Sequence, residues 1–162
     1  MHIKHQKNMQ EQNCQIMTKY LKMTIDILSG IHGCSDSILY GDWRITKDNT
    51  FVRLKKLNHL LTEDKLKLIN FKDIAWKGMS LDLSMRRENC ICCHGKRFAN
   101  CNTDYPCIVT RFTGDIPNPF NKTYRMLDGK HRIDKMIYQG ITKSLFYLLD
   151  LNEIIPYTEL RR

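Results

Sequence analysis

The sequence lacks a long hydrophobic segment. No apolar run approaches the roughly 18 residues that a helix needs to span a bilayer, so we expect no contact with a membrane. The first residues, Met1-His-Ile-Lys-His-Gln-Lys7, are polar and have no apolar core like that of a secretory signal peptide. We therefore expect the protein to work in a reducing cytoplasm, where its seven cysteines would be thiols or metal ligands rather than disulfides.

Internal repeats and low-complexity tracts are also missing, and acidic residues are outnumbered. A chain of 162 residues with 42% hydrophobic and 27% charged residues is typical of one soluble domain with a core. The net charge of +9 is uneven. Residues 65–162 carry seventeen Lys and Arg against ten Asp and Glu, whereas residues 1–64 carry nine against seven. This basic second half suits a polyanionic partner, such as a nucleic acid or a nucleotide.

Residues 1–64 have the pattern of an N-terminal helix plus a hairpin extension. Apolar residues recur at helical spacing from residue 8 to about residue 29, so this helix either packs on the core or binds a protein partner. Two strands are predicted over residues 37–45 and 50–57, and the turn-forming residues 46–49 would join them into a hairpin.

The second half, residues 65–162, alternates strands with short helices and is predicted to be an α+β domain. Thr62 is a suitable N-cap for a short helix that precedes the first strand of this domain. The apolar patterns predict strands over residues 67–76, 105–111, 124–127 and 144–149, and a last strand or helix over residues 152–162.

One strand, turn and helix in this domain contain the most informative residues of the chain. Asp128 is a suitable helix N-cap and Gly129 permits a tight turn. Apolar residues at i, i+3 and i+4 then predict one buried helix face, and Gly140 is placed as a helix C-terminal glycine. The residues of that face are Ile133, Met136 and Ile137.

Potentially cationic side chains crowd the start of this helix. Gly129, Lys130, His131 and Arg132 combine the unpaired N–H groups of a helix N-terminus with donors that suit phosphate oxygens. The alternative is a solvated first turn, although cations at that position oppose the helix dipole. The mismatch favours a bound anion.

Leu127-Asp-Gly-Lys-His-Arg132 resembles the (D)G-x-(H/R)-R signature of the ParB/sulfiredoxin-like superfamily. The resemblance covers roughly residues 66–155 and implies a ParB/sulfiredoxin-like mixed sheet flanked by helices. It also implies that the turn holds the phosphates of a nucleotide or a nucleic acid. Sulfiredoxin chemistry needs a cysteine where this chain has Lys130, and a partition protein needs a helix-turn-helix domain for which the chain leaves no room. We therefore expect a stand-alone ParB-like module, similar to small phage-encoded proteins that act in the host cytoplasm.

Two other functions stay open. The chain could be a ParB-like nuclease or nucleotide hydrolase, with Asp128 and His131 as catalytic acid/base groups or metal ligands. It could also be a structural or anti-host interaction protein, for example a viral one, that has kept the fold without ligand chemistry. The sequence does not decide whether the protein is an enzyme.

Arg86 and Arg87 lie in a segment, residues 79–88, that suits either a helical turn or a loop. They are candidates for contact with nucleic-acid phosphates. We prefer the simpler interpretation that they serve surface solubility or pair with Glu88.

A cysteine-rich loop, residues 88–107, contains five of the seven cysteines. Four thiolates from one loop would suit structural zinc, which takes four ligands in a tetrahedron. The alternatives are a disulfide, which the expected compartment disfavours, and a set of small buried thiols. The candidate ligands are Cys90, Cys93, Cys101 and Cys107, with Cys92 and His94 as alternates.

Overall fold

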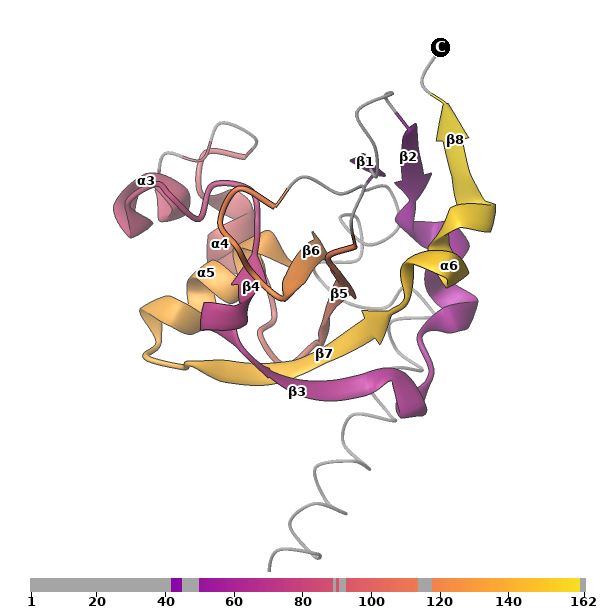
Figure 1. Ribbon diagram of the computed structural model, residues 1–162. Coiled ribbons are helices and arrows are strands. Elements are labelled where there is room, and N and C mark those ends of the chain that lie inside the picture. Colours follow the sequence, from indigo (N-terminus) through magenta and orange to yellow (C-terminus); the bar gives the residue numbers. More distant parts are fainter. Residues whose placement is uncertain (1–41, 45–49, 89, 91–92, 114–117, 161–162) are drawn as a thin grey trace, which may run out of the picture.

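A computed structural model describes residues 42–44, 50–88, 90, 93–113 and 118–160 (Figure 1). These residues form a mixed α+β fold, which confirms the predicted α+β class, while the ParB/sulfiredoxin-like arrangement stays a prediction. The predicted N-terminal helix, residues 8–29, and the predicted hairpin turn, residues 46–49, lie outside the described residues. Among the described helices, none has the length and the apolar character that crossing a membrane requires.

The larger sheet has five strands in the order β3-β7-β5-β6-β4. It is mixed, because β3 with β7 and β5 with β6 are antiparallel, whereas β7 with β5 and β6 with β4 are parallel. Its strands are β3 (Leu66–Asn70), β4 (Ile74–Ala75), β5 (Cys107–Arg111), β6 (Tyr124–Asp128) and β7 (Lys143–Leu149).

Both faces of this sheet are buried, and successive residues of one strand point to opposite faces. On β5, Ile108 faces one apolar cluster, whereas Cys107 and Val109 face the other. This follows from the alternation of side chains along a strand, and it explains why the strands are almost continuously apolar. Three short helices lie together on the second face (Figure 1): α3 (Leu83–Arg87), α4 (Lys96–Asn100) and α5 (Lys130–Tyr138).

The first face is covered by residues from both ends of the described chain. The 3₁₀ helix η1 (Leu54–Leu60) and helix α6 (Leu151–Ile154) supply Leu54, Leu57 and Ile154 to the same apolar cluster as Ile108. A second, antiparallel sheet lies beside them in the order β1-β2-β8. Its strands are β1 (Asp42–Arg44), β2 (Thr50–Arg53) and β8 (Thr158–Leu160).

The predicted hairpin is confirmed in the pairing of β1 with β2, but its second strand is shorter than expected. Residues 54–57 belong to η1 instead, because Leu54 and Leu57 both turn into the core. The predicted strand 67–76 is also wrong as one element. It is broken at Phe71–Asp73, so β3 and β4 lie at opposite edges of the sheet.

Helix α5 follows its prediction closely at its C-terminal end. Ile133 and Met136 are buried as expected. Gly140 has a φ of 78°, its N–H donates to Ile137, and the N–H of Ile141 donates to Met136. This is the Schellman arrangement, which needs a left-handed residue and therefore favours glycine.

Candidate metal centre

The turn between β6 and α5 is built around Gly129. Its φ is 111°, and a Cβ at this position would lie 2.2 Å from the Sγ of Cys107. Only glycine fits both the backbone conformation and this close approach. Gly129 itself takes the N-cap position, so the prediction that Asp128 caps the helix is wrong. Asp128 ends β6 and uses its carboxylate elsewhere.

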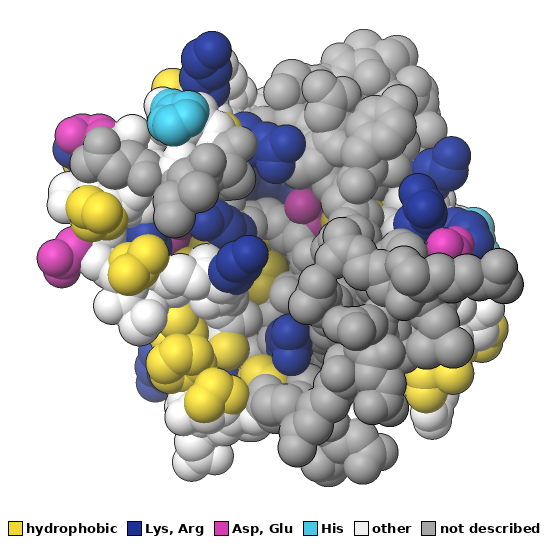
Figure 2. All heavy atoms as spheres, turned by 90° about the horizontal axis from the view of Figure 1, so that it is seen from above, with side chains coloured by type: hydrophobic (Ala, Val, Ile, Leu, Met, Phe, Trp, Pro, Cys, Tyr) yellow, Lys and Arg dark blue, Asp and Glu magenta, His cyan; other side chains and the backbone are white. Residues whose placement is uncertain are grey.

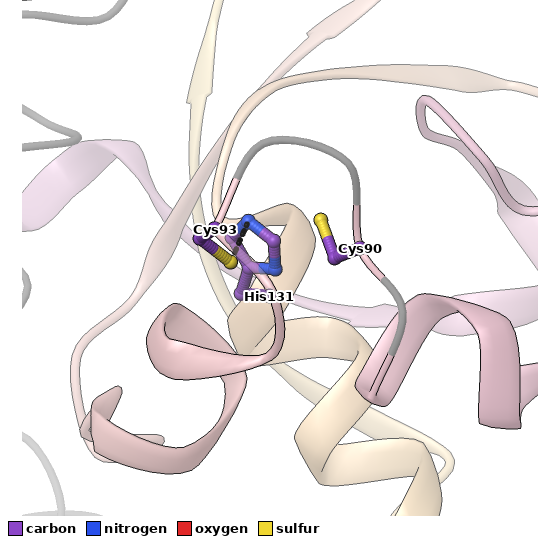
Figure 3. Close-up of side chains that lie close together, drawn as sticks. All are labelled: Cys90, Cys93 and His131. Atoms are coloured by element: carbon purple, nitrogen blue, oxygen red, sulfur yellow. Dashed lines mark hydrogen bonds between the residues drawn. The ribbon is translucent and has the colours of Figure 1, made fainter.

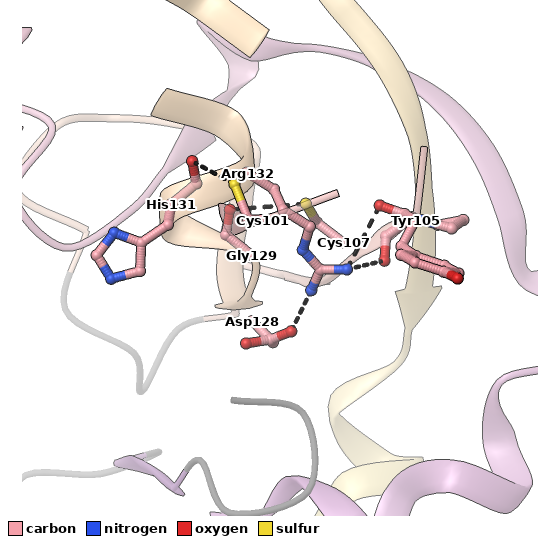
Figure 4. Close-up of polar contacts among 8 residues, drawn as sticks. Cys101, Tyr105, Cys107, Asp128, Gly129, His131 and Arg132 are labelled. Carbon is pink, nitrogen blue, oxygen red and sulfur yellow. Dashed lines mark hydrogen bonds and ion pairs between the residues drawn. The ribbon is translucent and has the colours of Figure 1, made fainter. Parts of the chain in front are cut away.

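Asp128 and Arg132 form a buried ion pair (Figure 4). The Nη2 of Arg132 donates to the Asp128 carboxylate, while Nη1 donates to the backbone oxygens of Pro106 at 3.1 Å and Tyr105 at 3.4 Å. Arg132 is only 2% exposed. Its guanidinium therefore ties the start of α5 to the end of β6 and to the chain entering β5, which differs from the phosphate contact predicted for it.

His131 points away from this ion pair, toward the cysteine-rich loop (Figure 4). Its Nε2 lies 4.0 Å from the Sγ of Cys93. The ligand atoms of Cys90, Cys93 and His131 all lie within 4.8 Å of one another, so this Cys₂His cluster could hold a metal ion (Figure 3). Ligand atoms of tetrahedral zinc lie about 3.5 to 3.8 Å apart, so small side-chain movements would close the site around an ion.

The loop places its two cysteines through a tight backbone turn. The N–H groups of Cys93 and His94 donate to the carbonyl oxygen of Cys90, at 3.2 and 2.7 Å. His94 and Gly95 then have positive φ values of 48° and 80°. The backbone N–H of Arg97 donates to the Sγ of Cys93 at 3.4 Å, and this contact helps to fix the position of the thiol.

The surroundings of His131 keep its imidazole neutral. Burial lowers its pKa from 6.5 to about 4, and the charges of Lys130 and Arg97 add to this effect. Neutral imidazole is the form that binds metal ions. Lys130 also approaches the first cysteine, with its Nζ 3.8 Å from the Sγ of Cys90.

The predicted set of four cysteine ligands is not the set that the fold brings together. Cys101 and Cys107 are buried, and their thiols donate to the backbone oxygens of His131 at 3.6 Å and Gly129 at 3.7 Å. Both thiols thus hold the backbone at the start of α5 through hydrogen bonds. Of the alternates, His94 is exposed and Cys92 lies outside the described residues.

Arg86 and Arg87 differ from each other in their surroundings. Arg86 is 8% exposed and pairs with the fully buried Asp134 at 2.5 Å, while Trp76 donates to the same carboxylate oxygen at 3.1 Å. Arg87 pairs with Glu88, as preferred above, and its guanidinium lies 4.6 Å from the ring centre of Tyr138. Arg86 is thus buried and paired with Asp134, and Arg87 is the more accessible of the two arginines.

The sequence prediction missed two roles. His131 was a candidate for phosphate binding, for catalysis and for a metal site shared with Asp128, but not for a metal site shared with the cysteines, because 38 residues separate it from Cys93. Asp134 was not singled out at all, although an acid on the apolar side of a helix is a signal for a buried partner.

Comparisons with models of known protein families, with curated proteins and with solved structures find no match for this chain. The resemblance of residues 127–132 to the ParB/sulfiredoxin-like signature therefore stays a prediction.

Proposed function

We propose that this protein is a zinc-centred binding module in which Cys90, Cys93 and His131 hold the ion. The observation that carries the proposal is the convergence of two thiols and one neutral imidazole within 4.8 Å. Thiolate and imidazole are the ligands that zinc takes most often in proteins, and Cys-x-x-Cys is a usual spacing for the first two.

The ion would stabilise a part of the fold that has little core of its own. Helices α3 and α4 have five residues each, and each buries a single side chain, Arg86 and Phe98. Helices this short are marginal without tertiary support. Zinc bound to both the cysteine-rich loop and α5 would supply that support. The ion would join the chain between α3 and α4 to α5.

A phosphate-bearing ligand, either a nucleotide or a nucleic acid, is the partner that best fits the charge around this centre. Lys and Arg side chains outnumber Asp and Glu on the described part of the face in Figure 2. The positive charges of Lys130 and Arg97 both act on His131. Because Arg132 is occupied by Asp128, phosphate contacts would fall to Lys130, Arg97 and the N–H groups near Gly129.

Joint acid/base catalysis by Asp128 and His131 has less support. The two side chains point in different directions, Asp128 toward Arg132 and His131 toward the cysteine-rich loop (Figure 4). A nuclease or hydrolase would need both groups at one substrate atom.

Elemental analysis of protein purified under reducing conditions tests the zinc centre. We expect about one zinc per chain in the unaltered protein and in Cys101→Ser, whose thiol lies outside the cluster. We expect Cys93→Ser and His131→Asn to lose it. Circular dichroism should accompany each variant, to show that it is folded. Absence of zinc from the unaltered protein, or its retention in both ligand variants, would refute the proposal.

The partner is tested by thermal shift with CTP, ATP, GTP and short DNA. We expect stabilisation by at least one of these ligands and a weaker response in Lys130→Gln. A response equal in the two proteins would remove Lys130 from the phosphate site.

A further inference from the structure

The Cys₂His cluster has three members among the residues that the structure describes. Structural zinc sites are closed by four protein ligands, whereas sites with three keep one position for water or a ligand. Among the described residues, the other cysteines and the histidine of the cysteine-rich loop have other contacts or orientations. Cys101 and Cys107 donate to backbone oxygens, and His94 is exposed with its backbone held in the left-handed turn.

The charges around the cluster leave it with a positive excess. A zinc ion with two thiolates and a neutral imidazole has no net charge. Lys130 then adds a positive charge, 3.8 Å from the Sγ of Cys90, and Arg97 follows the second cysteine in the chain. Since charges close to a partly buried metal are poorly screened, an anion in the remaining position would be favoured.

The two acids closest to His131 in the chain do not supply that anion. Asp134 is fully buried and is held by Arg86 and Trp76. Asp128 is held by Arg132 on the far side of the turn. Both carboxylates are therefore paired within the fold, and the Nζ of Lys130 lies beside the Sγ of Cys90, one of the proposed metal ligands.

We propose that the metal keeps one exchangeable coordination position and that an oxygen of a phosphate group takes it, with Lys130 as the second contact. The inference rests on the proposed zinc centre. Zinc accepts oxygen ligands at about 2.0 to 2.2 Å, and an ammonium group is a common phosphate donor. The same site would accept free phosphate or the terminal phosphate of a nucleotide.

Cobalt substitution gives a direct test, because the visible spectrum of Co²⁺ reports the geometry and the number of thiolates. The Co²⁺-loaded protein is titrated separately with inorganic phosphate and with ATP. We expect a two-thiolate spectrum whose d–d bands change and then saturate as either ligand is added. Tighter binding of ATP would assign the site to a nucleotide, and equal binding would assign it to the phosphate group alone.

Two lysine variants separate the phosphate contact from general charge. Lys130→Gln should lower the phosphate affinity about tenfold, the effect of one charge-assisted contact, while Co²⁺ affinity changes little. Lys143→Gln, an exposed lysine at the start of β7, removes the same charge and should change neither affinity.

Three results would overturn the inference, and they are distinguishable. A spectrum with three or more thiolates would show a closed site. A two-thiolate spectrum that neither phosphate nor ATP changes would leave the zinc centre standing without an exchangeable position for phosphate. Failure to bind Co²⁺ or Zn²⁺ would remove the proposed centre itself.

Discussion

His131 and Arg132 are neighbours in the chain, but their side chains serve opposite sides of the same turn. Arg132 is buried and satisfied, with an ion pair to Asp128 and two backbone oxygens as acceptors. His131 faces two thiols from the cysteine-rich loop, with its Nε2 4.0 Å from the Sγ of Cys93, and all three ligand atoms lie within 4.8 Å of one another. One residue completes the fold, and the other belongs to the candidate metal cluster.

The same division separates the cysteines. Cys101 and Cys107 donate to backbone oxygens of the turn and belong with Arg132. Cys90 and Cys93 converge on His131. A sequence motif can thus contain a structural half and a chemical half, and the groups that each side chain faces distinguish them.

The structural half should give the largest loss of stability. Arg132→Met leaves the Asp128 carboxylate buried without its cation, which costs about 3 to 5 kcal/mol of unfolding free energy. Urea denaturation of the metal-free protein would measure this. Adding Asp128→Asn to the same chain should recover most of the loss. A single variant as stable as the unaltered protein would show that the ion pair is not a determinant of the fold.

Gly129→Ala should come next. The left-handed backbone costs a non-glycine residue roughly 1 to 2 kcal/mol, and overpacking against Cys107 adds about 1 to 3 kcal/mol. Gly140→Ala is the matched control, because Gly140 has a φ of 78° but no atom within 4 Å of its missing Cβ. Equal losses of stability in the two variants would argue against the close packing of Gly129 on Cys107.

Near neutral pH, the chemical half should affect stability only when metal is present. At a free zinc concentration 100 times the dissociation constant, the metal stabilises the unaltered protein by about 2.7 kcal/mol. His131→Asn should lose this gain and still fold without metal to nearly the same stability. Thermal melts with zinc and with a chelator would separate the two terms. The same gain with zinc in both proteins would contradict the role of His131.

His131 should also make the metal-free protein less stable in acid. The histidine of the unfolded chain takes up a proton near pH 6.5, whereas in the folded protein burial, Lys130 and Arg97 hold its pKa at about 4. Between these values the unfolded state binds more protons, so stability falls as the pH falls from about 6.5 to about 4. His131→Gln should flatten this part of the pH profile. An unchanged slope in that variant would assign the acid sensitivity to other groups.

The smallest effect is expected at Arg87. In its ion pair with Glu88, the glutamate side chain is largely exposed to solvent. Such pairs contribute about 0 to 1 kcal/mol to the free energy of unfolding. Arg87→Ala should therefore change stability little, whereas Arg86→Ala should destabilise strongly by leaving Asp134 buried and unpaired. Chemical denaturation of the two variants side by side would test the difference.

Local sequence patterns predicted those features of the fold that depend on residues close together in the chain. The end of α5 at Gly140, the burial of Ile133 and Met136, and the strands on either side of α5 all depend on spacing within a few residues. These features follow from helix and strand periodicity and from the conformational freedom of glycine.

Contacts between segments far apart in the chain could not be predicted from the sequence. The break at Phe71–Asp73 sends β3 and β4 to opposite edges of the sheet, although the local pattern resembles one strand. The backbone oxygens that accept from Arg132 lie 26 and 27 residues away in the chain, and Cys93 lies 38 residues from His131. Charge at the helix start predicted that this turn matters, but only the tertiary fold divides its residues between structure and chemistry.

X-ray absorption at the zinc edge of the metal-loaded protein tests the central claim most directly. The account predicts two sulfur ligands at about 2.3 Å and one imidazole nitrogen at about 2.0 to 2.1 Å, with one further light atom completing the tetrahedron. His131→Asn should lose the imidazole signal, and Cys101→Ser should leave the spectrum unchanged. Four sulfur ligands, or a spectrum in which His131→Asn makes no difference, would contradict the account.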